Sequence, residues 1–205
     1  MIKILDCTFR DGGYYNKWDF NSSLVQKYLY ALDSANIDVI ELGFRNFPHD
    51  QFLGAFAYTT DNYIDTLNID KSITVGVMID AGSILNSELS IDDAVNSLFQ
   101  AKEKSRVDLV RIATHFECIE QCKEIAEALK KLGYMVGLNL MQPHAIANQE
   151  LSKAAELIQG WGIVDVLYFA DSLGGMNGSD VARILSALKS GWKGDIGFHA
   201  HNNKG

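Results

Sequence analysis

The 205-residue sequence contains few of the features that mark linkers, disulfide scaffolds or membrane proteins. It has two prolines and three cysteines, and no apolar run is long enough to span a bilayer. An odd number of cysteines without metal-type spacing favours reduced thiols, as in the cytoplasm. The first residues also lack the pattern of a signal peptide. These absences predict one cytoplasmic domain over residues 1–205, with no membrane partner.

Blocks of like charge are absent as well, although the net charge is −8. This balance argues against a basic nucleic-acid face, so no nucleic-acid partner is predicted. It is compatible with a cation held by carboxylates. No GxGxxG follows the first predicted strand, where "RDGGYYN" stands, and this argues against a dinucleotide site.

Seven short runs rich in β-branched and apolar residues predict strands, and amphipathic stretches lie between most of them. The strands are expected at 3–9, 39–44, 73–79, 109–114, 135–141, 164–170 and 195–201. Helices are expected within 21–36, 118–133, 148–162 and 178–191. The stretch 45–71 has no clean period and predicts irregular or partly helical structure.

Alternating strands and helices predict an α/β fold with parallel strands, either an open doubly wound sheet or a closed barrel. A TIM (βα)8-type barrel has eight strands and typically about 250 residues. Strands one to seven can be assigned here, and the eighth is missing from this chain. We therefore expect a single TIM-barrel domain, incomplete at its C-terminus, whose native chain continues past Gly205.

Polar residues gather where the predicted strands end, which is where parallel α/β folds place their chemistry. Four of the five histidines are among them. The strand-end residues are Arg10, Asp11, Glu41, Arg45, Thr114, His115, Gln142, His144, Asp171, Ser172, His199 and His201.

His199 and His201 are two apart, so on one strand both side chains would project to the same face. Two imidazoles there can bind one cation, and Asp11 is the natural third ligand. Such a site leaves positions open for substrate and suits Mn²⁺, Fe²⁺, Co²⁺ or Zn²⁺. The alternative is two polar histidines satisfied by backbone and water.

Three further groups have both a functional and a structural interpretation. Arg10 and Asp11 can face one site only if the chain turns, and Gly12–Gly13 suits a turn. Glu41, within an apolar strand, needs a partner such as Arg10 or Arg111, and that pair can be purely structural. "ADSLGG", residues 170–175, offers two polar side chains and backbone amides to a small anion, or is a simple turn.

Several of these segments resemble a known superfamily. "LDCTFRDGG" is similar to the DxTxRDG signature of the metal-dependent (DRE-TIM, HMG-CoA lyase-like) lyase and aldolase barrels, and "IELGF" and "GFHAHNN" resemble their second- and seventh-strand segments. Within that superfamily, "VRIATH" and "ADSLGGM" look most like 4-hydroxy-2-oxovalerate aldolase. The resemblance spans the whole chain.

The resemblance implies a divalent-metal-dependent carbon–carbon lyase acting on a 2-oxoacid through a pyruvate-type enolate. Mn²⁺ is the expected cofactor, with Mg²⁺, Co²⁺ or Zn²⁺ as alternatives. The implied roles are metal binding for Asp11, His199 and His201, enolate stabilisation for Arg10, positioning of Arg10 for Glu41, and substrate binding for Ser172, Asp171 and His144.

The chain departs from the aldolase pattern at Tyr14, where the family has a histidine that serves as base. Tyrosine has an unperturbed pKa of about 10 and is a poor base at neutral pH. His115, His144, a metal-bound water or Tyr14 with a shifted pKa could take that role.

Two alternatives remain open: a Claisen-type acyl-CoA condensing enzyme resembling 2-isopropylmalate synthase, and a barrel homologue that binds a metal or metabolite without turnover. A homo-oligomer is compatible with the sequence. The region that carries the family's dehydrogenase-docking helices is absent, so nothing here indicates a dehydrogenase partner.

Overall fold

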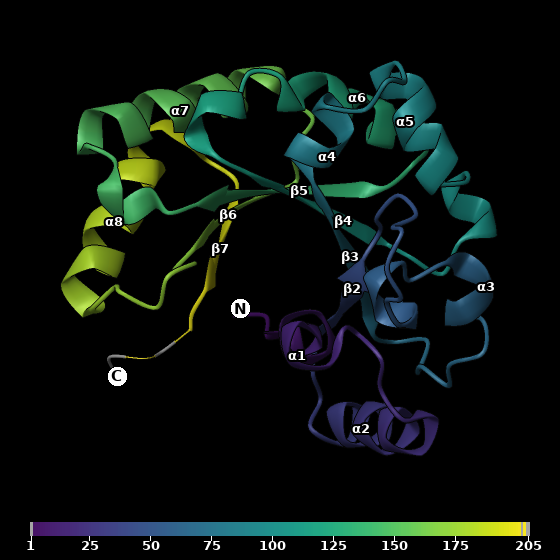
Figure 1. The fold of residues 1–205 in the computed structure, drawn as a ribbon. Helices are drawn as coiled ribbons and strands as arrows, with labels where there is room; N and C mark the ends of the chain where they lie inside the picture. Colours follow the sequence, from purple (N-terminus) through teal and green to yellow (C-terminus); the bar gives the residue numbers. More distant parts are fainter. Residues whose placement is uncertain (1, 202, 204–205) are drawn as a thin grey trace. The chain divides into compact units, whose positions relative to one another are not determined.

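The computed structural model describes residues 2–201 and 203 and contains seven strands (Figure 1). Their order in the sheet is their order in the sequence, β1-β2-β3-β4-β5-β6-β7. The strands are β1 (Leu5–Asp6), β2 (Val39–Phe44), β3 (Thr74–Asp80), β4 (Leu109–Thr114), β5 (Met135–Met141), β6 (Val166–Ala170) and β7 (Asp195–His199). This is the α/β pattern of a TIM-type barrel from its first to its seventh strand. No eighth strand occurs within the described residues.

Helices connect the strands throughout the described chain. The α-helices are α1 (Thr8–Asn16), α2 (Ser22–Ser34), α3 (Asp61–Ile64), α4 (Ala81–Leu85), α5 (Ile91–Leu98), α6 (Cys122–Lys131), α7 (Asn148–Trp161) and α8 (Gly178–Gly191). Short 3-10 helices are η1 (Ala55–Ala57), η2 (Lys102–Lys104), η3 (Phe116–Cys118) and η4 (Pro143–Ala145). None of the described helices is both long and apolar enough to cross a membrane.

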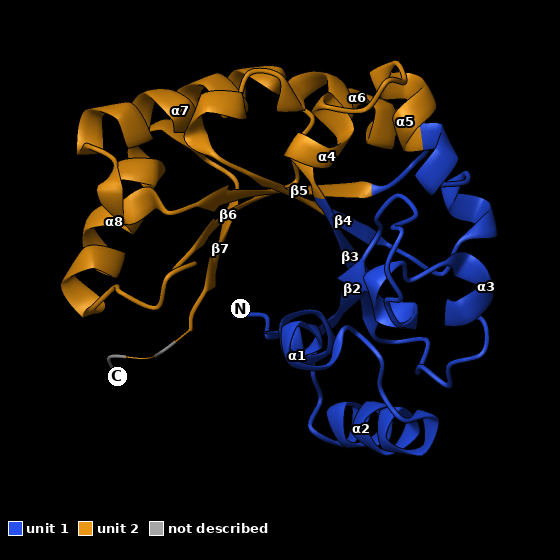
Figure 2. Cartoon of the chain, viewed as in Figure 1, with its two compact units in different colours: residues 1–79, 96–110, 132–134 blue, residues 80–95, 111–131, 135–205 orange. Residues whose placement is uncertain are grey.

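The chain divides into two compact units (Figure 2). The first comprises residues 1–79, 96–110 and 132–134, and the second comprises 80–95, 111–131 and 135–205. Three of the boundaries fall within elements, namely β3, α5 and β4. The expectation of one domain over residues 1–205 stays a prediction.

In the first unit, β1, β2 and β3 pair in parallel. All six residues of β2 are buried, which is typical of a strand covered on both faces. The register between β2 and β3 shifts once: Glu41 lies opposite Gly76, whereas Phe44 lies opposite Met78. Three steps along β2 therefore match two along β3, which is a β-bulge.

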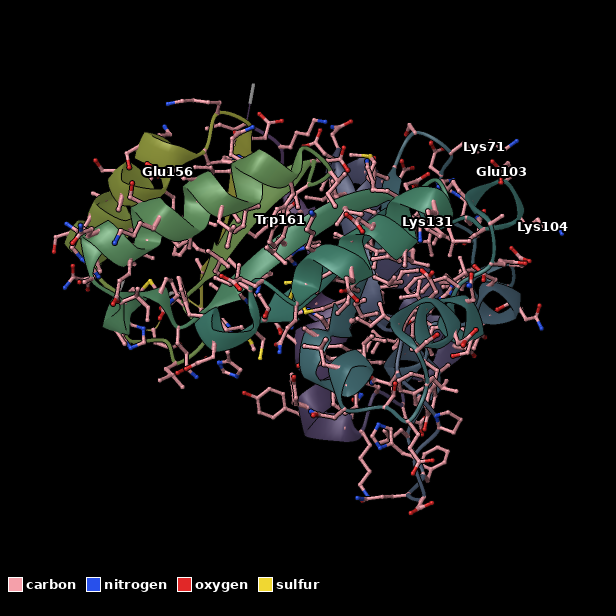
Figure 3. All side chains as sticks on the ribbon, turned by 90° about the horizontal axis from the view of Figure 1, so that it is seen from above. Lys71, Glu103, Lys104, Lys131, Glu156 and Trp161 are labelled. Atoms are coloured by element: carbon pink, nitrogen blue, oxygen red, sulfur yellow. The ribbon has the colours of Figure 1, made fainter. Side chains whose placement is uncertain are left out.

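In the second unit, β5, β6 and β7 pair in parallel without a shift in register. Phe169 of β6 stacks on Phe198 of β7 with ring centroids 4.8 Å apart. The helices of this unit turn charged side chains outward. Lys131 of α6 and Glu156 of α7 are both exposed (Figure 3).

Most of the predicted strands and helix ends are confirmed by the structure. The strands at 39–44, 109–114 and 135–141 match to the residue. Asn21 caps α2 by accepting backbone N–H groups of the first turn, and Gly133 adopts a φ of 93° shortly after α6. The stretch 45–71 contains only η1 and α3, as expected for a partly helical segment.

The first predicted strand, 3–9, was too long at both ends: β1 comprises only Leu5–Asp6, and α1 begins at Thr8. The Asp6 carboxylate accepts hydrogen bonds from the backbone N–H and hydroxyl of Thr8, which satisfies donors at the start of α1. Gly12 and Gly13 consequently lie inside α1 and do not form the predicted turn.

The seventh predicted strand was too long at its C-terminal end. β7 ends at His199, so His201 lies beyond the strand. The strand periodicity that was expected to align the two histidines does not extend to His201. Asn202 of the "GFHAHNN" segment lies outside the described residues.

Candidate active site

Arg10 is the centre of the candidate site in the first unit. Its Nε donates to Glu41 Oε1 at 2.5 Å, and its Nη1 lies 2.6 Å from Asp11 Oδ1. Arg10 is 7% exposed and Glu41 is fully buried. Of the two partners predicted for Glu41, the structure shows Arg10 in contact with it. Because α1 begins at Thr8, consecutive residues of one helical turn supply both the guanidinium and the second carboxylate.

The charge on Arg10 is fixed by these neighbours. Burial disfavours the guanidinium ion, but the carboxylates of Glu41 and Asp11 outweigh that effect and raise the pKa of Arg10 above its usual value. The guanidinium also lies 5.7 Å from the ring centroid of Phe44, within cation–π range. The site therefore holds a permanent, oriented cation.

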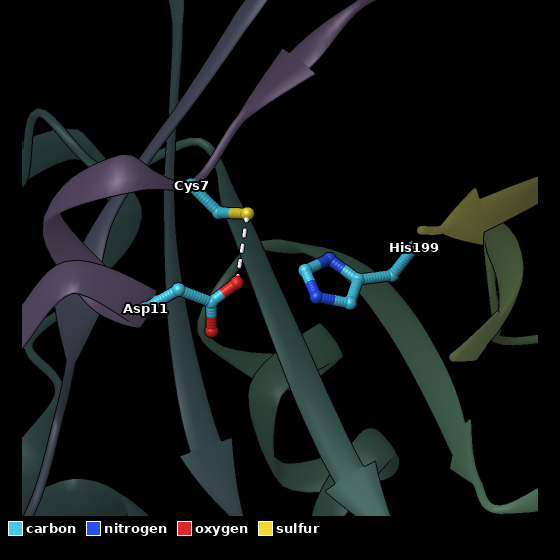
Figure 4. Close-up of side chains that lie close together, drawn as sticks. All are labelled: Cys7, Asp11 and His199. Atoms are coloured by element: carbon cyan, nitrogen blue, oxygen red, sulfur yellow. Dashed lines mark hydrogen bonds between the residues drawn. The ribbon is translucent and has the colours of Figure 1, made fainter. Parts of the chain in front are cut away.

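Asp11 combines internal contacts with access to solvent. Its Oδ2 accepts a hydrogen bond from Cys7 Sγ at 3.4 Å (Figure 4), while Oδ1 faces Arg10. The Asp11 side chain nevertheless remains 33% exposed. A carboxylate held in this way can still offer an oxygen to a cation.

Tyr14, the predicted substitute for the family histidine, lies one helical turn after Arg10 on α1. Its side chain is 65% exposed and meets the edges of two aromatic rings, Trp18 at 4.8 Å and Phe44 at 6.2 Å between centroids. The phenol is therefore accessible, and its ring is oriented by packing.

In the second unit, the structure brings His199 and His201 together. Their ring centroids lie 5.0 Å apart in an edge-to-face arrangement. His199 is half-buried and His201 is exposed. Two adjacent imidazoles can bind a transition-metal ion, because imidazole nitrogen is a common ligand of ions such as Zn²⁺ and Fe²⁺.

The loop after β6, for which an anion site and a simple turn were both possible, uses three of its backbone amides internally. Asp171 Oδ1 accepts hydrogen bonds from the N–H groups of Gly175 and Met176 at 2.8 and 3.1 Å, and the carbonyl of Asp171 accepts from Gly174. Asp171 is 2% exposed. These amides close the loop, and the Ser172 side chain in it is half-buried.

His115 and His144 also follow strands of the second unit. His115 is exposed and directly follows β4, and His144 lies in η4 after β5. Nδ1 of His144 is buried and has no hydrogen-bond partner among the described residues. Together with His199 and His201, they confirm that the histidines gather at the carboxyl ends of strands.

Sequence reasoning missed Asn139 and Tyr168, which both contact Arg111. Asn139 Oδ1 accepts a hydrogen bond from Arg111 Nη2 at 2.7 Å, and the Tyr168 ring lies 4.2 Å from the guanidinium. Arg111 is 1% exposed. A β-carbon at Gly137 or Gly197 would lie 2.9 or 2.2 Å from the Tyr168 ring, so both glycines make room for it. The sequence signals that could have identified this cluster were the asparagine and glycines inside apolar strands, Asn139 and Gly137 of β5 and Gly197 of β7.

Arg45, predicted at the end of the second strand, belongs to a structural ion pair. It binds both carboxylate oxygens of Asp61 at 2.7 and 3.1 Å, and donates to the carbonyls of Thr59 and Leu98. Burial raises the pKa of Asp61, but hydrogen bonds from Arg45 and Ser105 outweigh it and lower the pKa below its usual value. This network anchors the segment between β2 and α3.

Known proteins resemble the chain along its full length, although no family model matches it. It is 30% identical over 206 residues to a 4-hydroxy-2-oxovalerate aldolase of Geobacillus genomosp. 3, and 29% identical over 212 residues to one of Carboxydothermus hydrogenoformans. Each match covers all of this chain but 58% of the relative.

Solved structures with the same fold are also known. One is the N-terminal domain of a putative aldolase from Bacteroides vulgatus; it has a TM-score of 0.83, 33% identity, and coverage of 98% of this chain and 65% of that one. The carboxyl transferase domain of Rhizobium etli pyruvate carboxylase has a TM-score of 0.72 at 12% identity, covering 98% of this chain and 35% of that one. The second likeness shows the fold alone. Together with the DxTxRDG and HxH segments, these matches show that the chain has a TIM-type fold and resembles the 4-hydroxy-2-oxovalerate aldolases along its whole length.

Proposed function

We propose that this chain carries the catalytic centre of a divalent-metal-dependent aldolase that makes or breaks a carbon–carbon bond beside the carbonyl of a 2-oxoacid. The observation that carries the proposal is the buried Arg10 cation, oriented by Glu41 and Asp11 in the first turn of α1. Retro-aldol cleavage leaves negative charge on an enolate oxygen. A preorganised cation where that charge develops lowers the barrier to reaction.

The metal would be held by Asp11, His199 and His201. When bound, a divalent ion would act as a Lewis acid toward the 2-oxoacid carbonyl. The residues fit this group, since the two imidazoles are adjacent and the Asp11 carboxylate is partly exposed. Mn²⁺ is the first choice, and Mg²⁺, Co²⁺ and Zn²⁺ are the alternatives.

The other residues would bind the substrate and move protons. Ser172 would donate a hydrogen bond to the substrate carboxylate, with Asp171 holding the loop that carries it. Tyr14, His115 and His144 are the candidate bases. His144 has a buried imidazole nitrogen without a hydrogen-bond partner among the described residues, and this supports its candidacy.

Cleavage of a series of 4-hydroxy-2-oxoacids with Mn²⁺, followed through pyruvate formation, tests the activity. Arg10→Ala should lower the rate about 10²–10³-fold, which is typical for loss of one stabilising donor. Arg106→Ala is the matched control, because Arg106 is a partly exposed arginine of the same unit that pairs with Asp108. A rate unchanged by Arg10→Ala would contradict the assigned role.

Metal analysis tests the ligand set separately from turnover. Wild type and His199→Ala are loaded with Mn²⁺, passed through a desalting column and compared for bound metal. His49→Ala is the control, because His49 is an exposed histidine of the first unit. Equal metal content in wild type and His199→Ala would rule out His199 as a ligand.

One observation favours a second candidate. A Claisen-type acyl-CoA condensing enzyme would use the same metal and arginine, and a metal-binding barrel without turnover suits the tyrosine at position 14 in place of the family histidine. Consumption of acyl-CoA in the presence of a 2-oxoacid would support the first. Tight Mn²⁺ binding with no turnover of any oxoacid would support the second.

A further inference from the structure

We propose that Trp18 is a positioning residue for Arg10, an inference that rests on the proposed aldolase function. The indole Nε1 donates to the backbone carbonyl of Arg10 at 2.9 Å. Arg10 is the third residue of α1, and its guanidinium is the buried cation of the site. The contact therefore ties a side chain beyond the end of the helix to the helical turn that carries the chemistry.

The backbone that places this indole is strained at two consecutive residues. Lys17 and Trp18 have φ values of 59° and 58°, both in the left-handed region that residues other than glycine rarely adopt. Two such residues in succession persist only where the surrounding structure holds them, and such strain concentrates at functional sites. The N–H of Trp18 is held by the carbonyl of Gly13, and the carbonyl of Lys17 by the N–H of Gly54.

Two glycines make room for the Trp18 segment. A β-carbon at Gly13 would lie 1.9 Å from Cδ1 of the indole, and one at Gly54 would lie 2.2 Å from the Trp18 carbonyl oxygen. A glycine within a helix destabilises it relative to alanine. Gly13 is thus explained by the indole that covers it, and the motif "RDGG" is coupled through space to Trp18.

Trp18 also contacts the rings that surround the cation. Its ring meets Tyr14 edge-on at 4.8 Å and Phe44 at 5.8 Å, and Phe44 in turn lies within cation–π range of Arg10. One side chain therefore restrains the carbonyl of Arg10, the aromatic ring near its guanidinium and the candidate base Tyr14. Small displacements of such groups reduce the rate of reaction more than substrate affinity.

Trp18→Phe tests this role, because phenylalanine keeps an aromatic ring and removes the N–H donor. Trp192→Phe is the matched control: Trp192 lies in the second unit, is more deeply buried, and donates Nε1–H to the Asp195 carbonyl at the same 2.9 Å. The comparison uses the Mn²⁺-loaded chain and the best 4-hydroxy-2-oxoacid substrate. The readouts are kcat, KM, Tm and hydrogen–deuterium exchange of the amides in residues 8–16.

Trp18→Phe is expected to lower kcat about 10- to 100-fold with KM changed less than threefold, and to speed exchange in residues 8–16. Trp192→Phe should lower Tm at least as much and leave kcat within threefold. Equal effects of both variants on kcat, or unchanged exchange in residues 8–16 of Trp18→Phe, would overturn the proposal. A wild type without turnover would contradict the proposed aldolase function. Hydrogen–deuterium exchange of residues 8–16 in wild type and Trp18→Phe would then decide alone whether Trp18 holds the helical turn that carries Arg10.

Discussion

The two compact units hold their candidate site residues in contrasting ways. In the first unit, Arg10 and Glu41 are buried and joined by a short ion pair. In the second, His199 is half-buried and His201 is exposed. Loss of one partner of a buried ion pair destabilises the fold strongly, whereas an exposed imidazole such as that of His201 contributes little to the folding free energy. Substitution of the buried pair in the first unit should therefore lower stability more than substitution of His201 in the second.

Glu41→Ala is expected to have the largest effect. It leaves the Arg10 guanidinium buried without its main carboxylate, and loss of one partner of a buried pair costs about 3–5 kcal/mol. The free energy of unfolding in urea measures this change. Glu41→Gln keeps an acceptor oxygen in place and should cost less. Equal stability of Glu41→Ala and wild type would break the contrast between the units.

Asp61→Asn should lower the free energy of unfolding by about 2 kcal/mol at pH 7, because hydrogen bonds to a charged group are worth about that much. The pKa of Asp61 lies below its usual value in the folded chain. Its contribution is therefore complete above the unfolded pKa of about 4 and is lost as pH falls through the lowered folded pKa. Urea unfolding at several pH values should show the two proteins converging in acid, and a constant gap would contradict the ion pair.

His201→Ala should change the free energy of unfolding by no more than about 0.5 kcal/mol, as is usual for an exposed position. Under the proposed function, Mn²⁺ affinity should nevertheless fall at least tenfold in a calorimetric titration. Unchanged affinity would remove His201 from the ligand set. A large loss of stability without metal would show that this histidine belongs to the fold.

The smallest expected effect is a difference in thiol reactivity between the two cysteines of the second unit, Cys118 and Cys122, with no change in stability. Burial raises the pKa of Cys122 to about 11, so little thiolate forms at pH 8. Cys118 is only half-buried. Iodoacetamide labelling followed by mass spectrometry should modify Cys118 first, and equal rates would indicate that the start of α6 opens readily.

The sequence predicted best where burial alone determines structure. The strands at 39–44, 109–114 and 135–141 are apolar runs, and all three were placed to the residue. The pairing of Glu41 with Arg10 was among the two predicted options, because a buried carboxylate in an apolar strand needs a cation.

Prediction was wrong where local contacts override residue preference. Glycines at 12 and 13 suggested a turn, but Asp6 starts a helix and the Trp18 indole occupies the space above Gly13. The loop after β6 suggested an anion site or a simple turn, and Asp171 accepts hydrogen bonds from the amides of Gly175 and Met176 there. The error at Gly12 and Gly13 involves the side chains of Asp6 and Trp18, which lie outside the "RDGG" motif and which periodicity does not report.

The bulge in β2 changes which face of the sheet its side chains point to. Glu41 and Phe44 are three residues apart, and in a regular strand an odd spacing sends side chains to opposite faces. The extra residue between them reverses that alternation, so both side chains reach the guanidinium of Arg10. Deleting one residue between them would restore regular pairing with β3 and turn either the carboxylate or the ring away. The contacts of this arginine thus depend on a count of residues as much as on their identity.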